Sequence, residues 1–231
     1  MENKRCSVAI DGPSGAGKST IAKAAAARFG FIYVDTGAIY RTVGLAAARA
    51  GVHPRDEEGV KSLLPGLSIR FDYGPDGAQR MFLGQEDVSR EIRRPEISMY
   101  ASAVSAIPAV RAFLLDMQRD MAKTSSVVMD GRDIGTVVLP DAGLKIFLTA
   151  SVEARAARRM AELAARGDPS TLEEVTADMI RRDEDDSTRA AAPLRAADDA
   201  VYVDTTAMTL EESIDRVCAL VAERFLLEPG K

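Results

Sequence analysis

The sequence has 231 residues, of which 46% are hydrophobic and 28% are charged. These proportions are typical of a folded globular protein and argue against a disordered chain or a membrane-spanning one. The formal net charge of −5 argues against a broad basic face, so we expect no nucleic-acid partner. No stretch approaches about 18 apolar residues, so we expect no membrane partner either. Cys6 and Cys218 lie in apolar surroundings and are expected to be core residues. Residues 1–5 lead directly into a strand-like run with no signal-peptide pattern, so we expect a cytoplasmic protein.

Five short apolar runs predict strands over residues 7–11, 31–35, 127–130, 145–149 and 200–204. Longer helical patterns lie between them, and the last predicts a helix over residues 210–226. This alternation predicts an α/β fold of three layers, in which a parallel sheet has helices on both faces. Helix ends are marked by Gly30 and Gly51, while residues 170–174 contain two overlapping capping boxes.

Two segments interrupt the alternation. Between residues 65 and 92, Leu67, Ile69 and Phe71 alternate with polar residues, and residues 72–77 form a turn pattern that leads into residues 79–83. This pattern predicts a small antiparallel sheet inserted into the α/β core. Residues 166–169 read as a hinge between two charged helices, which is a candidate lid.

The sequence GPSGAGKS, from Gly12 to Ser19, fits the pattern G-x-x-x-x-G-K-[ST] between a predicted strand and a predicted helix. Glycines allow successive backbone N–H groups to face phosphate oxygens, and the helix N-terminus adds partial positive charge. Lys18 is expected to reach the β and γ phosphates, and the Ser19 hydroxyl is expected to bind Mg²⁺. The sequence therefore predicts a site for a nucleoside triphosphate.

This loop alone is compatible with an ATPase, a GTPase or a kinase. The guanine-reading pattern N-K-x-D is absent from the sequence, which disfavours a switch GTPase. A kinase requires a second pocket for the acceptor of the phosphoryl group, and candidates for it follow the second and third predicted core strands.

Thr36 is expected to cap the helix after residues 31–35, with Arg41 projecting from its second turn. Arg132 and Asp133 follow the strand over residues 127–130, at the sheet edge where open α/β sheets bind ligands.

Two further groups of polar residues are candidates for this pocket. Arg182, Asp186 and Arg189 share one helical face by their spacing, and Arg181 with Asp185 forms a neighbouring stripe that spacing does not exclude. Ser102 and Arg111 flank Pro108, which must end or bend a helix. The spacing of these residues does not by itself identify what they bind.

Taken together, the motifs DGPSGAGKST, DTGAIYR, VSREIR, DGRDIGTVV and RRDEDDSTRAAAPL, with the inserted sheet, resemble the bacterial cytidylate kinases. These are short-chain nucleoside monophosphate kinases of the P-loop class. The resemblance extends from Val8 to about Leu220. It implies a single P-loop kinase domain over residues 1–231, with an NMP-binding insert at about 63–103 and a lid at about 155–190.

The resemblance also implies roles for individual residues. ATP would be bound by Gly12, Pro13, Ser14, Gly15, Ala16, Gly17, Lys18, Ser19 and Thr20. The acceptor α-phosphate would be held by Arg41, Arg132 and Arg189, and the ribose by Arg182 with Asp186. Thr36, Ser102, Arg111 and Asp133 match the cytosine-reading set, although the family often has Ser at position 36. Arg158 matches a lid arginine that reaches the donor phosphates.

The implied activity is transfer of the γ-phosphoryl group of ATP to CMP or dCMP, with Mg²⁺, by a monomer. Lys18, Arg132, Arg158 and Arg189 would stabilise the transferring group. The exocyclic amine of cytosine can donate a hydrogen bond to Asp133 or Ser102, whereas uracil presents a carbonyl at that position, so CMP and dCMP are expected to be preferred over UMP. His53, the only histidine, is expected to be a loop residue without a catalytic role.

Two other functional hypotheses are alternatives to a cytidylate kinase. Kinases of adenylate, uridylate or shikimate share the first loop and the general layout. A nucleotide-binding regulatory protein on a kinase scaffold would have lost turnover, and the retained Lys18 and arginines argue against it.

Overall fold

The computed structural model describes residues 5–75, 77–165 and 167–227. The chain divides into two compact units, one made of Met1–Tyr33 with Ala122–Lys231 and the other of Val34–Met121. We call them the β1 unit and the α2 unit and describe each by itself. Asp76 of the predicted turn and Arg166 of the predicted hinge lie outside the described residues. The bounds expected for the NMP-binding insert, about 63–103, and for the lid, about 155–190, remain predictions.

The central sheet has five strands in the order β2-β6-β1-β7-β8. They are β1 (Ser7–Asp11), β2 (Ile32–Asp35), β6 (Val127–Gly131), β7 (Leu144–Thr149) and β8 (Val201–Asp204). β1 pairs in parallel with both β6 and β7, and β7 pairs in parallel with β8. The predicted parallel sheet is confirmed, and each strand begins and ends within one residue of its predicted bounds.

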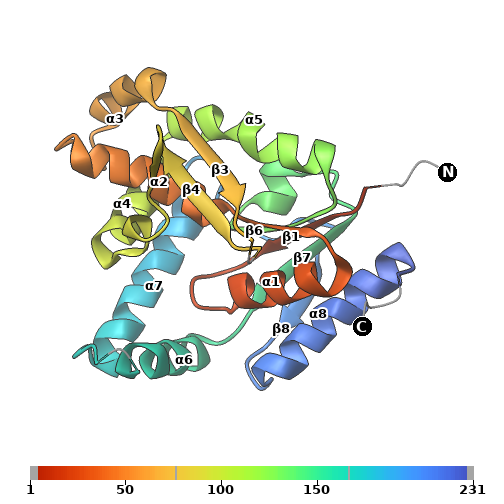
Figure 1. Ribbon diagram of the computed structural model, residues 1–231. Helices are drawn as coiled ribbons and strands as arrows, with labels where there is room; N and C mark the ends of the chain where they lie inside the picture. The colour runs from red at the N-terminus through yellow and green to blue at the C-terminus, as the bar shows by residue number, and fades with distance from the viewer. Residues whose placement is uncertain (1–4, 76, 166, 228–231) are drawn as a thin grey trace. The chain divides into compact units, whose positions relative to one another are not determined.

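Helices flank this sheet and supply its apolar cover. In the β1 unit α1 (Lys18–Phe29) and α8 (Leu210–Phe225) lie side by side (Figure 1) and share one core with the strands. Ile21 and Ala22 of α1 meet Val217 of α8 and Ile10 of β1 in that core. Cys218 is buried there, as expected. The expectation for Cys6 was wrong, because it precedes β1 and is only partly buried.

A second helical pair in the β1 unit consists of α6 (Val152–Ala164) and α7 (Leu172–Thr188), which pack against each other through Ala156, Val175 and Met179. Thr171 and Glu174 form the capping box at the start of α7, so the structure selects one of the two overlapping boxes. Between β6 and β7 the chain forms a short π-helix, η3 (Ile134–Val138), which the sequence pattern did not predict.

The α2 unit combines helices with the predicted antiparallel sheet. Its elements are α2 (Thr36–Arg49), α3 (Glu57–Leu63), η1 (Leu64–Gly66), β3 (Ile69–Tyr73), β4 (Gln79–Leu83), β5 (Glu86–Asp87), η2 (Glu91–Arg93), α4 (Pro95–Ser105) and α5 (Pro108–Thr124). The sheet order is β3-β4-β5 with antiparallel pairs. The short strand β5 was not predicted, because two polar residues carry no alternating pattern.

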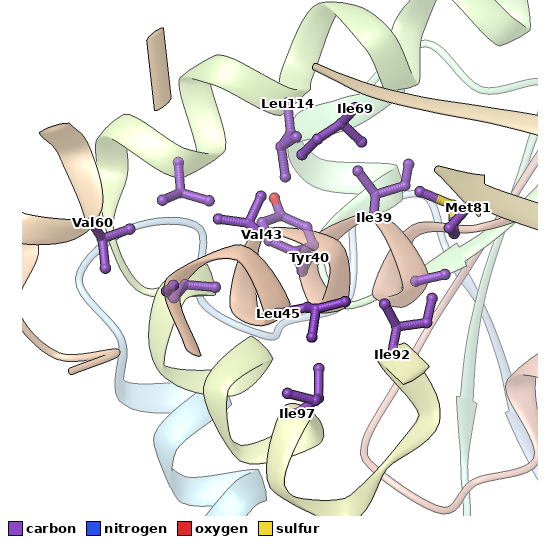
Figure 2. Packing of buried hydrophobic residues seen from close by; sticks show 14 of the residues in the cluster. Ile39, Tyr40, Val43, Leu45, Val60, Ile69, Met81, Ile92, Ile97 and Leu114 are labelled. Atoms are coloured by element: carbon purple, nitrogen blue, oxygen red, sulfur yellow. The ribbon is translucent and has the colours of Figure 1, made fainter. Parts of the chain in front are cut away.

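Helix α2 is the centre of its unit. Figure 2 shows Ile39, Tyr40, Val43 and Leu45 of α2 surrounded by apolar side chains from the other elements. These surrounding residues are Val60 of α3, Ile69 of β3, Met81 of β4, Ile92 of η2, Ile97 of α4 and Leu114 of α5. A helix buried on so many sides has a fixed position and rotation. The core therefore fixes where the first turns of α2, with Thr36 and Arg41, place their side chains.

The break between α4 and α5 occurs where Pro108 predicts it. α4 ends at Ser105 and α5 begins at Pro108, with a bend of 99° between the two helices. No single helix of the described residues is long and apolar enough to cross a membrane, and this bent pair passes such a test only by length and composition. Val104 of α4 and Leu114 of α5 are buried in the core of the α2 unit.

Gly12, the first residue after β1, provides a test of how closely the loop approaches the sheet. Its φ is 153°, and a Cβ there would lie 1.9 Å from the backbone oxygen of Leu148 on β7. Gly30 also has a positive φ, of 65°, but nothing lies within 4 Å of the position that a Cβ would take there.

We expect Gly30→Ala to lower the free energy of unfolding by about 1 kcal/mol. Gly12→Ala should lower it by about 3 kcal/mol or more, because backbone atoms must also move. Urea unfolding measures both losses, and equal losses would contradict the close approach.

Candidate functional site

The glycine-rich loop joins β1 to α1 in a geometry that favours anion binding. Gly17 is the N-cap residue of α1 with a left-handed φ of 88°, and no side chain of the described residues caps this helix start. The first-turn N–H groups of α1 therefore have no side-chain acceptor of the usual capping kind. Together with the helix dipole, such N–H groups form a favourable environment for phosphate oxygens.

Lys18 is held inside this loop. Only 6% of the residue is exposed, and its Nζ donates a hydrogen bond to the carbonyl oxygen of Pro13 at 2.7 Å. Burial, and next the charge of Arg132, lower the pKa of Lys18 to about 7. Asp130, Asp186 and Asp11 act in the opposite direction. An ammonium group in this position gains strongly from a nearby anion, because burial has removed most of its hydration.

Ser19, the next residue, is hydrogen bonded to a carboxylate at the end of the neighbouring strand. Its Oγ donates to Asp130 Oδ2 at 2.8 Å, and the Tyr33 hydroxyl donates to Asp130 Oδ1 at 2.9 Å. Asp130 lies beside Ile10 in the parallel β1–β6 register, so the sheet itself sets this contact. Asp130 is the first residue of the motif DGRDIGTVV, but the sequence predicted no role for its side chain.

Four charged residues of the β1 unit form one cluster. Arg132 Nε donates to Asp186 Oδ2 at 2.6 Å, and Arg189 Nη1 lies 3.8 Å from the other oxygen of Asp186. Arg189 Nη2 also lies 3.5 Å from Asp133 Oδ1. Asp186 thus connects two of the arginines that the sequence singled out, and Asp133 faces one of them. Each side chain is largely shielded from water, with 5% to 27% of its surface exposed.

Asp11, the last residue of β1, organises the segment that carries Arg132 and Asp133. Its two carboxylate oxygens accept hydrogen bonds from the backbone N–H groups of Ile134 and Gly135, at 2.8 and 2.7 Å. Burial raises the pKa of Asp11 to about 6, although both N–H groups act to lower it. One buried side chain therefore connects the start of the phosphate loop to the start of η3.

The remaining candidates of the β1 unit lie on α6 and α7 and have other partners. Arg182 Nε pairs with Asp178 at 2.9 Å, and Arg181 binds the same carboxylate from a more exposed position. Arg189 is the C-cap residue, so α7 ends before it. Arg158 donates from both terminal nitrogens to Thr205, after β8. The roles expected for Arg158 and Arg182 remain predictions.

In the α2 unit, Arg41 is positioned by the residue that begins its helix. Asp35, not Thr36, is the N-cap residue, because its side chain accepts from the Ala38 N–H. The expectation that Thr36 caps the helix was wrong. A carboxylate one residue earlier fulfils that role, and Thr36 is buried as the first helical residue. The other oxygen of Asp35 binds Arg41 Nη2 at 2.9 Å.

Gln79 of β4 in turn fixes Asp35. Its side-chain oxygen accepts from the Asp35 backbone N–H at 2.8 Å, and its side-chain nitrogen donates to the Asp35 carbonyl at 3.3 Å. Gln79 is only 8% exposed. The sequence signal for this role was a polar residue within a predicted strand, since a buried polar group needs a hydrogen-bond partner.

Ser102 and Arg111 lie on the two sides of the bend between α4 and α5. Arg111 is 9% exposed, donates to the Ser105 carbonyl at 3.1 Å and lies over the ring of Tyr40, 5.5 Å from its centroid. The carbonyl of Ser102 accepts from the Ser105 hydroxyl at 2.8 Å. Through Ser105 the structure brings the two predicted residues into one local network.

The residues around Ser19 suit a magnesium ion bound with a triphosphate. A hydroxyl and a carboxylate from Ser19 and Asp130 are hard oxygen ligands, of the kind that Mg²⁺ binds while keeping waters and phosphate oxygens. Lys18 and the uncapped start of α1 lie next to them along the chain. The donor set therefore fits the group that the sequence predicts.

The chain is similar to known proteins over nearly its full length. A family model described as cytidylate kinase matches residues 8–223. A "Cytidylate kinase" of Geobacter sulfurreducens is 52% identical over 96% of this chain and 95% of its own length. A protein of the same name from Mycolicibacterium paratuberculosis is 53% identical over 94% of this chain and 95% of its own length.

A crystal structure of an uncharacterized protein from Eubacterium ventriosum has a similar fold. It covers 95% of this chain and 99% of its own, with a TM-score of 0.52 at 12% identity. On the family match and the close relatives together, this chain belongs to the cytidylate kinase family.

Proposed function

We propose that this protein is a nucleoside monophosphate kinase that transfers the γ-phosphoryl group of ATP to CMP or dCMP. The observation that carries the proposal is the charge cluster of the β1 unit, where Arg132 and Arg189 share the carboxylate of Asp186. Two shielded guanidinium groups in the same unit as a glycine-rich phosphate loop suit a reaction between two phosphorylated substrates. Relatives of about this chain's length that bear the name cytidylate kinase support the choice of acceptor.

The donor is assigned to the loop from Gly12 to Thr20. Its backbone N–H groups and Lys18 would bind the phosphates of ATP, and Ser19 with Asp130 would hold Mg²⁺. When bound, the metal ion supplies positive charge that offsets the negative charge of the phosphates. The pairing of Ser19 with Asp130 at 2.8 Å supports this assignment, since it already orients the hydroxyl.

The acceptor is assigned to the residues that the family resemblance implies. Arg41, Arg132 and Arg189 would hold the α-phosphate of CMP, and Arg182 with Asp186 would bind the ribose. Thr36, Ser102, Arg111 and Asp133 would read the base. Each phosphate-binding arginine has a carboxylate partner within its own unit, Asp35 for Arg41 and Asp186 for the other two. These partners keep the guanidinium groups oriented before substrate binds.

Phosphoryl transfer needs little covalent chemistry from the protein. The acceptor phosphate oxygen is already ionised, so no general base is required, and the catalytic task is alignment and stabilisation of negative charge. Lys18, Arg132, Arg158 and Arg189 are the residues we assign to that task. A cytoplasmic location, a monomeric state and the contact of Arg158 with the donor are parts of the same proposal.

The first prediction concerns the acceptor. The purified protein with ATP and Mg²⁺ should release ADP rapidly with CMP and dCMP, and at least about tenfold more slowly with UMP, because a uracil carbonyl cannot donate to a carboxylate. AMP, GMP and shikimate should give little turnover in the same coupled assay. Binding of ATP without turnover on any acceptor would favour the alternative, a nucleotide-binding regulatory protein.

The second prediction concerns base recognition. Asp133→Ala should reduce the preference for CMP over UMP by about tenfold in kcat/KM, since an acceptor for the cytosine amine is lost. Asp141→Ala, at an exposed position after η3, is the matched control and should keep the preference. If Asp133→Ala leaves CMP affinity and the preference unchanged, Asp133 does not read the base.

The third prediction concerns protons. Without nucleotide the pKa of Lys18 is lowered to about 7, and phosphate oxygens beside the ammonium group should raise it again. Binding of MgADP at about pH 8 should therefore take up protons, and it should take up fewer at about pH 6, where Lys18 is already charged. Calorimetry in buffers of different ionisation enthalpy measures this uptake.

Two variants identify the group that takes up the proton. Lys18→Met should abolish the uptake, whereas Lys23→Met, at an exposed position of the same helix, should keep it. Equal proton uptake at both pH values by the unchanged protein would show that Lys18 does not titrate on binding.

A further inference from the structure

One residue of the phosphate loop, Ser14, has both of its main-chain polar groups bound by a pair of opposite charges. The Ser14 N–H donates to Asp183 Oδ1 at 3.2 Å, and the Ser14 carbonyl accepts from Arg155 Nη1 at 2.8 Å. The two charged groups also bind each other, with 2.7 Å between Arg155 Nη1 and Asp183 Oδ2. The three contacts form a closed ring within the β1 unit.

This ion pair differs from an ordinary surface salt bridge. The side chain of Arg155 is 7% exposed and that of Asp183 is 22% exposed, and Arg155 Nε donates to the Ala150 carbonyl at 3.0 Å. A shielded pair whose arginine is also held through its Nε has a defined geometry, whereas exposed pairs contribute little. The family resemblance implied no role for either residue, although Asp183 lies within the motif RRDEDDSTRAAAPL.

The pair joins the phosphate loop to two helices. Arg155 belongs to α6 and Asp183 to α7. Met179, one turn before Asp183 on α7, also packs against the loop, since its Cε lies 2.8 Å from where a Cβ on Gly15 would be. The same helix carries Asp186, which binds Arg132. Hydrogen bonds, ion pairs and side-chain packing thus connect the phosphate loop to α6, to α7 and to the charge cluster that contains Arg132.

Peptide geometry shows what this connection does. In a trans peptide the C=O and N–H groups point in opposite directions. The Ser14 N–H points toward Asp183, so the carbonyl of the preceding Pro13 points the other way, where it accepts from Lys18 Nζ at 2.7 Å. The Ser14 carbonyl points toward Arg155, so the N–H of Gly15, on the other side of the same peptide plane, is directed away from Arg155.

We propose that Arg155 and Asp183 are positioning residues for the donor phosphates. They orient two successive peptide planes of the loop, one that holds Lys18 and one that directs the Gly15 N–H toward phosphate. The inference rests on the proposed kinase function for its activity measurements. It does not depend on which acceptor the enzyme uses, because the groups that it concerns belong to the donor site.

The test compares Arg155→Met and Asp183→Ala with exposed neighbours on the same two helices. Arg159→Met on α6 and Glu184→Ala on α7 remove the same kinds of charge without touching the loop. We expect kcat/KM for ATP to fall by about tenfold or more in the first two variants, while KM for CMP changes by less than about threefold. The controls should stay within about twofold of the unchanged protein.

Three further measurements separate positioning from folding. Calorimetric titration with MgADP, without acceptor, should show weaker binding in Arg155→Met and Asp183→Ala at a temperature where circular dichroism shows both variants folded. Asp183→Glu should recover part of the loss, whereas Arg155→Lys should not, because lysine lacks the planar fork. The double variant should lose little more than the worse single variant, since the two residues act as one unit.

The results distinguish failure of the positioning role from failure of the proposed kinase function. If both variants bind MgADP as the controls do and keep kcat/KM for ATP, or if their losses follow only a lower melting temperature, the positioning role is wrong. If MgADP binding weakens as expected but the unchanged protein transfers nothing to CMP, the positioning role holds and the proposed function fails.

Discussion

Burial of the Lys18 ammonium group is the constraint on which the arrangement of the β1 unit depends. A charge removed from water needs compensation, and the carboxylates of Asp130, Asp186 and Asp11 supply it against the repulsion of Arg132. Each of these carboxylates also binds other groups of the site. Asp130 holds Ser19, Asp186 connects two arginines, and Asp11 fixes the start of η3. The groups that make a buried lysine tolerable are therefore also the groups that order the site.

In the α2 unit, too, a carboxylate orients a charged side chain of the candidate site. Arg41 lies in the first turns of a helix whose other faces are buried, and the cap residue Asp35 holds its guanidinium group. Asp35 is itself fixed at both backbone groups by Gln79 of the small sheet. The antiparallel insert thus contributes more than a hydrophobic cover, because it supplies the amide that determines how α2 begins.

Local sequence patterns predicted most of the helices and strands, but they could not predict contacts between residues far apart in the sequence. Strand bounds followed from apolar runs between glycines and charged turns, and Pro108 marked the break between two helices. The cap of α2 was misassigned because Asp35 and Thr36 are adjacent and both are good capping residues. The partners of Ser14 and Ser19 lie 169 and 111 residues away in the sequence. No local spacing rule connects such positions, so Asp183 and Asp130 received no role until the fold placed them.

The carboxylate partners of the candidate arginines also suggest how an acidic protein would bind phosphorylated substrates. The net charge of −5 would repel a polyphosphate if it were spread evenly, but Arg41, Arg132 and Arg189 are each held by carboxylates. A phosphate that approaches such a pair meets donors already oriented, and it competes with a carboxylate rather than with water for them. Part of the attraction is lost in that exchange, so under the proposed function binding would depend on several arginines. Under the proposed function, such dependence favours ATP and CMP over a small free anion, because two phosphorylated substrates would engage more of these donors than one small anion can.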